Sequence, residues 1–278
     1  MIKTIALASL LAAGSTWAAS GELQTSARKL AAEHQDAIVW LSVIAKTSLS
    51  TDGDAPAQVK AQLAGQDKEE KSETTGTIID ASGLIVTSLA SIDKSSMVDG
   101  KTITTPMGAI KLKASTEIKE IKIIMPDGTE IPADLVLKDA DLGLGFVRAR
   151  KDSKEAEGVA FKAIDVTASA EGALLDDCVS LGRLNQNMNR EPSVVTSEIS
   201  GITTKPRKFY RVMTDSVGCP IFLANGKLLG LTTVRAPSGE MTSGQVNLVP
   251  VVLPAADLVK LAAQAKAAPA VKAPAEEK

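Results

Sequence analysis

The 278-residue chain carries 31 basic and 33 acidic side chains, and it has no Lys/Arg cluster dense enough to follow a phosphate backbone, which argues against a nucleic-acid binder. Hydrophobic residues make up 44% but aromatic ones only 3%, so Val, Ile, Leu and Ala must fill a core of one large or two small domains. One histidine and two distant cysteines form no metal-binding constellation, and the glycine pair Gly143 and Gly145 is no phosphate loop. We therefore expect neither a metal nor a cofactor.

The first residues are typical of a signal peptide. Lys3 supplies a positive charge, residues 5–13 form an apolar run too short to span a bilayer, and Thr16 and Ala18 are small residues before a cleavage site. The alternative is an apolar N-terminal helix. No later segment is long and apolar enough to span a membrane. We expect residues 1–18 to be removed and the protein to be exported, to a periplasmic or extracellular compartment.

The next residues predict one helix and one strand. An N-terminal helical segment is expected over 19–35, with good helix formers from 21 on, and His34 is interpreted as a solvated helix residue. The apolar, β-branched run 37–45 predicts the first strand. The polar stretch 47–73 predicts a long surface loop.

From residue 76 on, short strand signals alternate with turn residues. The predicted strands are 76–80, 84–87, 120–125, 130–137, 142–148, 178–181, 193–202, 209–214, 220–223, 227–233 and 245–250. Little helix lies between them, which predicts an all-β barrel or sandwich. A C-terminal helix is expected at about 253–265, and residues 266–278, which are mainly Ala, Pro, Lys and Glu, are expected to be a disordered tail.

Four segments resemble, in their order along the chain, the motifs of trypsin-like serine proteases of the HtrA/Deg type. They are GTIID with GLIVT at 76–87, DGTEIPADL at 127–135, DADLGL at 139–144, and DSVGCP at 215–220 followed by NGKLLG at 225–230. The resemblance implies a trypsin-like double β-barrel over 36–262, with a first barrel at about 36–150 and a second at about 158–250. No PDZ domain is expected after it.

The same comparison of motifs implies that two of the three catalytic positions are substituted. Ala90 stands where the family has its catalytic histidine, Val217 stands where it has the nucleophilic serine, and only Asp141 matches the aspartate that orients the histidine. A serine hydroxyl is a weak nucleophile without a neighbouring base. The resemblance therefore implies a pseudoprotease in which no catalytic residue is expected.

Two fallback nucleophiles stay open. Ser216 would align with the nucleophile if the loop held one extra residue, and Cys219 lies two residues past that position. Neither has a histidine partner in the motif, and Lys94 is the nearest residue for a Ser–Lys dyad. Asp215 replaces a glycine and would put a carboxylate near a developing oxyanion.

The two cysteines permit a disulfide. Cys178 lies in a segment that resembles the family's strand next to the one after the nucleophile loop, and an exported protein is in an oxidising compartment. A bridge from Cys178 to Cys219 requires a Cα–Cα separation below about 7 Å. Otherwise Cys219 is a small packed residue.

Three functions remain open. The first is a noncatalytic domain that binds a protein or peptide in the groove between the barrels, by pairing with an exposed strand edge. The second is a residual hydrolase that uses Ser216 or Cys219, and the third is a structural envelope protein. The sequence does not determine the oligomeric state.

Overall fold

A computed structural model describes residues 13–51, 53, 55–64, 67–105, 108–235 and 248–269. The helices are α1 (Ala13–His34), α2 (Ala57–Ala64), α3 (Leu89–Ile92), α4 (Ala255–Ala267) and the short 3-10 turns η1 (Gln35–Ala37), η2 (Lys94–Met97), η3 (Lys154–Ala156) and η4 (Gln186–Met188). The strands are β1 (Ile38–Thr51), β2 (Lys68–Asp80), β3 (Leu84–Ser88), β4 (Thr102–Thr105), β5 (Gly108–Ile124), β6 (Glu130–Asp139), β7 (Leu144–Ala149), β8 (Asp177–Arg183), β9 (Pro192–Thr203), β10 (Phe209–Val212), β11 (Pro220–Leu223), β12 (Leu228–Arg235) and β13 (Val249–Pro254).

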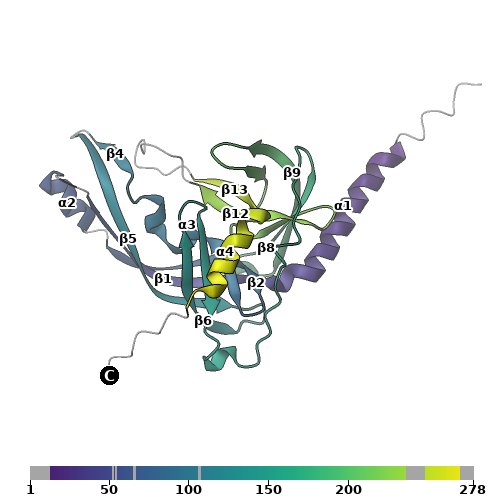
Figure 1. The fold of residues 1–278 in the computed structure, drawn as a ribbon, viewed down its shortest axis with the longest axis horizontal. Coiled ribbons are helices and arrows are strands. Elements are labelled where there is room, and N and C mark those ends of the chain that lie inside the picture. The colour runs from purple at the N-terminus through teal and green to yellow at the C-terminus, as the bar shows by residue number, and fades with distance from the viewer. Residues whose placement is uncertain are drawn as a thin grey trace, which may run out of the picture.

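The strands close into two antiparallel barrels (Figure 1). The first runs β1-β2-β3-β7-β6-β5 and closes where β5 pairs with β1, while β4 extends it beside β5. The second runs β8-β9-β10-β13-β12-β11 and closes where β11 pairs with β8. Each barrel therefore takes its first three strands in chain order and its last three in reverse. This confirms the predicted all-β, trypsin-like double barrel with an N-terminal and a C-terminal helix.

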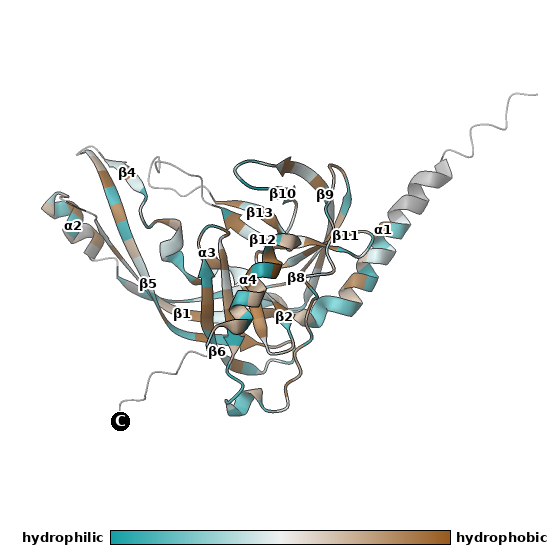
Figure 2. Cartoon of the chain, viewed as in Figure 1, coloured by the Kyte–Doolittle hydropathy of each residue, from teal (hydrophilic) through white to brown (hydrophobic). Residues whose placement is uncertain are grey.

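Aliphatic side chains fill the interiors, as the scarcity of aromatic residues requires. One cluster of buried residues fills the first barrel, with Val39, Leu41, Ile78, Ile85 and Ile123 among its members. Another fills the second barrel, with Ile199, Tyr210, Ile221, Leu229 and Val252. The largest cluster joins Phe146 and Leu84 of the first barrel to Leu181 and Leu231 of the second. Figure 2 shows the hydrophobic residues gathered in the central strands near α4. The barrels thus share one core across their interface.

The prediction of a surface loop over 47–73 is wrong. β1 continues to Thr51, α2 follows, and β2 begins at Lys68, so that this part of the chain projects from the first barrel beside β4 and β5 (Figure 1). Its charges lie on paired strands, where Lys46 stands opposite Glu69 and opposite charges across a ladder are favourable. Polar residues are favourable on a sheet face that is exposed to solvent, so the polar composition of this stretch is compatible with strands as well as with a loop.

The terminal helices extend beyond their predicted bounds. Within the described chain, α1 begins at Ala13, inside the expected signal peptide, whose residues 1–12 lie outside the described residues. α4 reaches Ala267, two residues into the expected tail, and residues 270–278 of that tail also lie outside them. No helix of the described residues has the length and hydropathy needed to cross a membrane.

Candidate functional site

The three positions that resemble a catalytic triad lie on three connections. Ala90 lies in α3, directly after β3. Asp141 lies in the turn between β6 and β7, and Val217 lies in the connection from β10 to β11. The first two belong to the first barrel and the third to the second, so any site that joins them lies at the interface of the barrels.

Threonine hydroxyls of β2 hold the Val217 connection against the first barrel. Thr75 Oγ1 donates to the Val217 carbonyl at 2.5 Å, and Thr77 Oγ1 donates to the Gly218 carbonyl at 2.8 Å. Thr87 of β3 donates in turn to the Thr75 carbonyl at 2.7 Å. Gly218 has a φ of +74°, and a Cβ atom there would meet the Thr75 carbonyl oxygen at 2.4 Å, so this close approach requires glycine.

Thr233 of β12 makes the matching connection to the other two positions. Its hydroxyl donates to the carbonyl of Gly143 at 2.8 Å, two residues after Asp141. It also lies 3.5 Å from the hydroxyl of Ser88, two residues before Ala90. The structure therefore brings the flanks of all three positions to one interface, where buried hydroxyls bind backbone carbonyls.

A small pocket opens beside Ala90. Its volume is about 130 Å³, and its walls include Leu89, Met97, Ala140, Val234 and Arg235 as well as Ala90 itself. Ala140 precedes Asp141, so the pocket lies between the positions that resemble the histidine and the aspartate. A larger side chain at position 90 would occupy this space.

Asp141 is engaged elsewhere. Its carboxylate accepts a hydrogen bond of 2.7 Å from Arg207, and its side chain is 76% exposed. Its backbone carbonyl accepts from Arg235. A carboxylate paired in this way, on the surface, is a structural ion pair and orients no imidazole in this structure.

The hydroxyl of Ser216 is bound to a carboxylate and not to an imidazole or an amine. Its hydroxyl donates to the neighbouring Asp215 carboxylate at 3.1 Å, and a Cβ atom at Gly182 would meet its oxygen at 2.8 Å. Asp215 accepts a second hydrogen bond from Ser193 at 2.6 Å. These contacts hold Ser216 within the second barrel, as part of a local polar cluster.

The only histidine of the sequence packs on Phe222 of β11. Its ring stacks on that of Phe222 with centroids 4.9 Å apart and planes at 8°, and its side chain is 28% exposed, so the interpretation of His34 as a solvated helix residue holds only in part. Burial lowers its pKa, against the opposing charge of Glu33. The ring therefore favours its neutral form and packs as an aromatic side chain.

Cys219 is fully buried, and its sulfur lies 3.2 Å from the Thr75 hydroxyl. Burial raises the pKa of its thiol to about 12, although the Thr75 hydrogen bond acts in the opposite direction. A thiol with that pKa holds almost no thiolate at neutral pH. Lys94 is equally unsuited to a dyad, because it is half exposed and forms an ion pair with Glu70.

The predicted disulfide between Cys178 and Cys219 is absent from the structure, in which both cysteines are free and buried. The register explains this. Cys178 of β8 stands opposite Leu223 of β11, and Cys219 precedes Leu223 by four residues. Four residues of extended chain span about 13 Å, well beyond disulfide reach. Cys219 is thus a small packed residue, the alternative stated above.

The end of β12 lies next to the pocket at Ala90, which Val234 and Arg235 help to line. The N–H of Thr232 donates to the Cys219 carbonyl at 2.9 Å, and its carbonyl accepts from Gly218 at 2.8 Å. Val234, two residues further, directs its N–H and carbonyl to the same side, away from β13, because backbone groups alternate sides along an antiparallel ladder and Pro250 stands opposite. The Val234 carbonyl oxygen lies against Gly143, where a Cβ atom would meet it at 3.3 Å.

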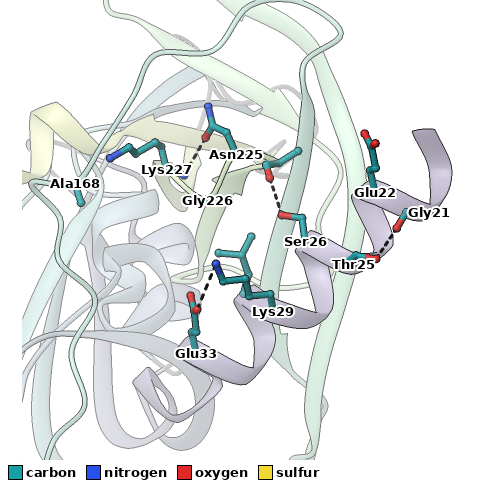
Figure 3. Close-up of a pocket in the computed structure, with 12 residues that line it drawn as sticks. Gly21, Glu22, Thr25, Ser26, Lys29, Glu33, Ala168, Asn225, Gly226 and Lys227 are labelled. Atoms are coloured by element: carbon teal, nitrogen blue, oxygen red, sulfur yellow. Dashed lines mark hydrogen bonds and ion pairs between the residues drawn. The ribbon is translucent and has the colours of Figure 1, made fainter. Parts of the chain in front are cut away.

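Another opening lies along α1. A depression of about 850 Å³ separates α1 from the turn at 224–227 (Figure 3). Ser26 donates to the Ala224 carbonyl across it at 2.6 Å, and Lys29 pairs with Glu33 at 3.9 Å. It is the seam along which α1 packs on the second barrel, and its charged groups do not converge on a common point (Figure 3).

Sequence reasoning missed the threonines and Val234. Thr75 and Thr77 occur in the run TTGT at 74–77, directly before the apolar residues 78–79, and Thr233 occurs in the run TT at 232–233 of an apolar strand. Buried hydroxyls need partners, so such runs could have indicated an interface. The orientation of the Val234 backbone depends on strand register and leaves no sign in the sequence.

The fold is a trypsin-like double β-barrel, and the three positions that resemble a catalytic triad hold alanine, a surface-paired aspartate and valine. No protein-family model matches the sequence, and no curated protein matches it. Among solved structures, the chain is similar to the apo MamO protease domain from Magnetospirillum magneticum, with 15% identity and a TM-score of 0.46 over 82% of this chain and 97% of that one. At this identity the similarity does not bear on activity.

Proposed function

We propose that this protein is an exported, noncatalytic domain of the HtrA/Deg type that binds an extended segment of a peptide or protein between its barrels. The observation that carries the proposal is the end of β12 beside the pocket at Ala90, where the N–H of Val234 is directed away from the neighbouring strand β13. A strand N–H that does not face a neighbouring strand is a group to which an extended segment can be added. The substituted triad positions leave that binding without cleavage.

The described geometry supports binding over hydrolysis. Ser216 lies against Asp215, Cys219 is a buried thiol with a pKa of about 12, and His34 stacks on Phe222. A serine or cysteine nucleophile is usually activated by an imidazole or amine base, and the described hydrogen bonds of Ser216 and Cys219 go to a carboxylate and a hydroxyl instead. The backbone edge needs only an extended partner, because its hydrogen bonds do not depend on the partner's sequence.

The test combines turnover with binding. The mature domain is incubated with denatured, fluorescently labelled casein, and both fragment release and fluorescence anisotropy are measured. We expect binding without turnover. Val234→Pro, which removes the N–H, should weaken binding about tenfold, whereas Val234→Ala, which keeps it, should weaken binding less.

Two results would overturn the proposal. One is casein turnover above background that is lost in Ser216→Ala or Cys219→Ser, which would establish a hydrolase. The other is an equal affinity of the Val234→Pro and Val234→Ala proteins for casein, with both folded by circular dichroism, which would place binding elsewhere or show that it is absent.

A further inference from the structure

The ladder between β5 and β6 opens into a cavity on the first barrel. Within the described chain these two strands pair only over 121–124 of β5, although β5 begins at Gly108 and β6 continues to Asp139. β5 instead runs beside β1 and towards β4 (Figure 1). The cavity where β5 and β6 diverge has a volume of about 300 Å³. We call it the β5–β6 cavity, and it is separate from the pocket at Ala90.

Backbone groups of β6 face this cavity. The N–H of Ala149 on β7 donates at 3.1 Å to the carbonyl of the residue before β3, on the side away from β6. Because backbone groups alternate sides along an antiparallel strand, Val147 and Gly145 of β7 also face away from β6. Their partners on β6 are Leu135 and Lys138, which both line the cavity. The N–H and carbonyl groups of Leu135 and Lys138 therefore point away from β7 and towards the cavity.

The edge of β5 faces the cavity over the same stretch. The N–H groups of Leu112 and Ala114 donate, both at 2.8 Å, to the segment that precedes β4, on the side away from β1. Alternation places the backbone groups of Thr116 and Ile118 on this same side. Both residues line the cavity. The edges of two strands therefore face one cavity.

A buried carboxylate connects the two strands where their pairing has stopped. Asp93, directly after α3, is buried and accepts hydrogen bonds from Lys138 of β6 at 2.6 Å and from the hydroxyl of Ser95 at 2.5 Å. The N–H of Ser95 donates to the Thr116 hydroxyl of β5 at 3.0 Å. The segment 93–95 thus bridges β6 and β5 in place of direct hydrogen bonds between them.

The lining of the cavity combines apolar side chains with charges that are already paired. Ile118 and Leu135 pack against the buried cluster of the first barrel, to which the lining residues Ile121 and Ala133 belong. The charged lining residues form the ion pairs Lys119–Glu117, Lys122–Glu120, Arg150–Asp134 and Lys138–Asp93. A charged ligand group would have to break one of these pairs or stay unpaired, which is costly. The cavity therefore favours an uncharged, aliphatic group.

We propose that the β5–β6 cavity binds an extended, uncharged peptide segment as an added strand, with one aliphatic side chain of the peptide against Ile118 and Leu135. The peptide backbone forms hydrogen bonds with the groups of Ile118, Leu135 and Lys138 that face the cavity. This site is separate from the one proposed at Val234 and does not depend on it.

The probe is the fluorescein-labelled peptide Ser-Gly-Thr-Thr-Val-Thr-Thr-Gly-Ser. Three relatives carry Asp, Lys or N-methylated Val at the central position. Anisotropy titrations of the mature protein should give saturable binding of the Val peptide. The N-methylated peptide, which lacks one N–H, and the two charged peptides should each bind at least about tenfold more weakly.

Amide hydrogen exchange of the unmodified protein locates the site. Saturation with the Val peptide should slow the exchange of the N–H groups of Ile118, Leu135 and Lys138 at least about fivefold. Ile118→Trp enlarges a side chain that lines the cavity and should weaken binding about tenfold. Ile202→Trp, at a partly buried position of the second barrel, is the matched control and should bind as the unmodified protein does.

The inference is overturned by the absence of saturable binding, or by equal affinities for the Val, Asp and N-methylated peptides. Protection confined to the N–H of Val234 would also overturn it, and would support the proposed function instead. Protection confined to Ile118, Leu135 and Lys138 would establish the β5–β6 cavity as the site, and the casein experiment would still decide the proposed function.

Discussion

At the scale of single residues, the backbone and side chains at the positions that resemble a catalytic triad bind to other groups. The Val217 carbonyl is bound by Thr75, and the Gly218 N–H donates to the Thr232 carbonyl at 2.8 Å. Asp141 is paired with Arg207. The connection between β10 and β11 is therefore held by hydrogen bonds that would have to break before it could adopt the conformation of an active site.

Restoring the two missing side chains alone should accordingly not restore activity. In Ala90→His with Val217→Ser, the Asp215 carboxylate and the buried Cys219 still occupy positions where the family has glycines that shape the oxyanion hole. Each misplaced donor costs about 3 kcal/mol in the barrier. We expect casein hydrolysis and labelling by an active-site serine probe to stay at background, and hydrolysis at the rate of an active relative would contradict this.

The thiols give a second prediction at this scale. Burial raises the pKa of both Cys178 and Cys219 to about 12. Because only the thiolate reacts, Ellman's reagent should modify neither residue in the native protein at pH 8, and both after unfolding in guanidinium. Cys178→Ser and Cys219→Ser identify each reacting thiol. Rapid reaction of one native thiol would show that its site is open.

At the scale of elements, α4 leaves the second barrel and ends on the first. Arg148 of β7 donates to the carbonyls of Lys266 and Ala268 at 3.1 and 2.8 Å, which satisfies carbonyls at the helix end. Lys266 pairs with Asp80 of β2 at 2.6 Å. The buried side of the helix, with Leu258, packs in the shared core. α4 therefore links the two barrels.

The Asp80 contact predicts a pH dependence. Hydrogen bonds from Lys266 and then Ser82 lower the pKa of Asp80 from 3.8 to about 2. A lowered carboxyl pKa stabilises the fold at pH values above about 4, and this contribution is lost as the pH falls from about 4 to about 2. The free energy of unfolding should therefore fall over this interval as Asp80 takes up a proton. In Asp80→Asn this fall should be about 1 kcal/mol smaller, which is the contribution expected of a partly exposed ion pair.

Urea titrations at several pH values measure this effect. Lys266→Gln removes the partner and should flatten the same interval, and the double variant should add little to either single change. An unchanged pH profile in both single variants would show that the pair contributes nothing measurable.

At the scale of the whole molecule, the two barrels meet through a core and a set of buried hydroxyls. Thr75 and Thr233 each connect segments far apart in the chain, 142 residues apart for Thr75 and Val217. When one partner of a buried hydrogen bond is removed, the other is left unsatisfied, and this costs more free energy than the bond itself contributes net. We therefore expect the interface to couple the folding of the two barrels.

Thr75→Val tests this coupling. It leaves the Val217 carbonyl without its donor and should lower the free energy of unfolding by about 1–3 kcal/mol. Fluorescence and circular dichroism should still report a single shared transition. Thr196→Val on the exposed side of β9 is the matched control and should change stability by less than about 0.5 kcal/mol. Two separate transitions would show that the barrels fold independently.

Several features were predictable from the sequence because their causes are local or lie in ordered motifs. Alternating apolar residues and turns such as Asn225-Gly226 predicted most strands, and four motifs in order predicted the double barrel and the positions Ala90, Asp141 and Val217. The charged stretch 47–73 was wrongly predicted to be a loop, because composition alone does not distinguish a loop from a strand with a solvated face.

What only the tertiary structure decided depends on strand register and barrel closure. Register separates Cys178 from Cys219 along adjacent strands, and it directs the backbone of Val234 away from β13 where Pro250 stands opposite. Barrel closure sets Arg235 beside Ala90, although they come from different barrels. Such contacts follow from the packing of distant segments, and no local pattern of residues encodes them. The sequence alone therefore determined the architecture and indicated the three positions that resemble a triad, and the tertiary structure decided what those positions contact.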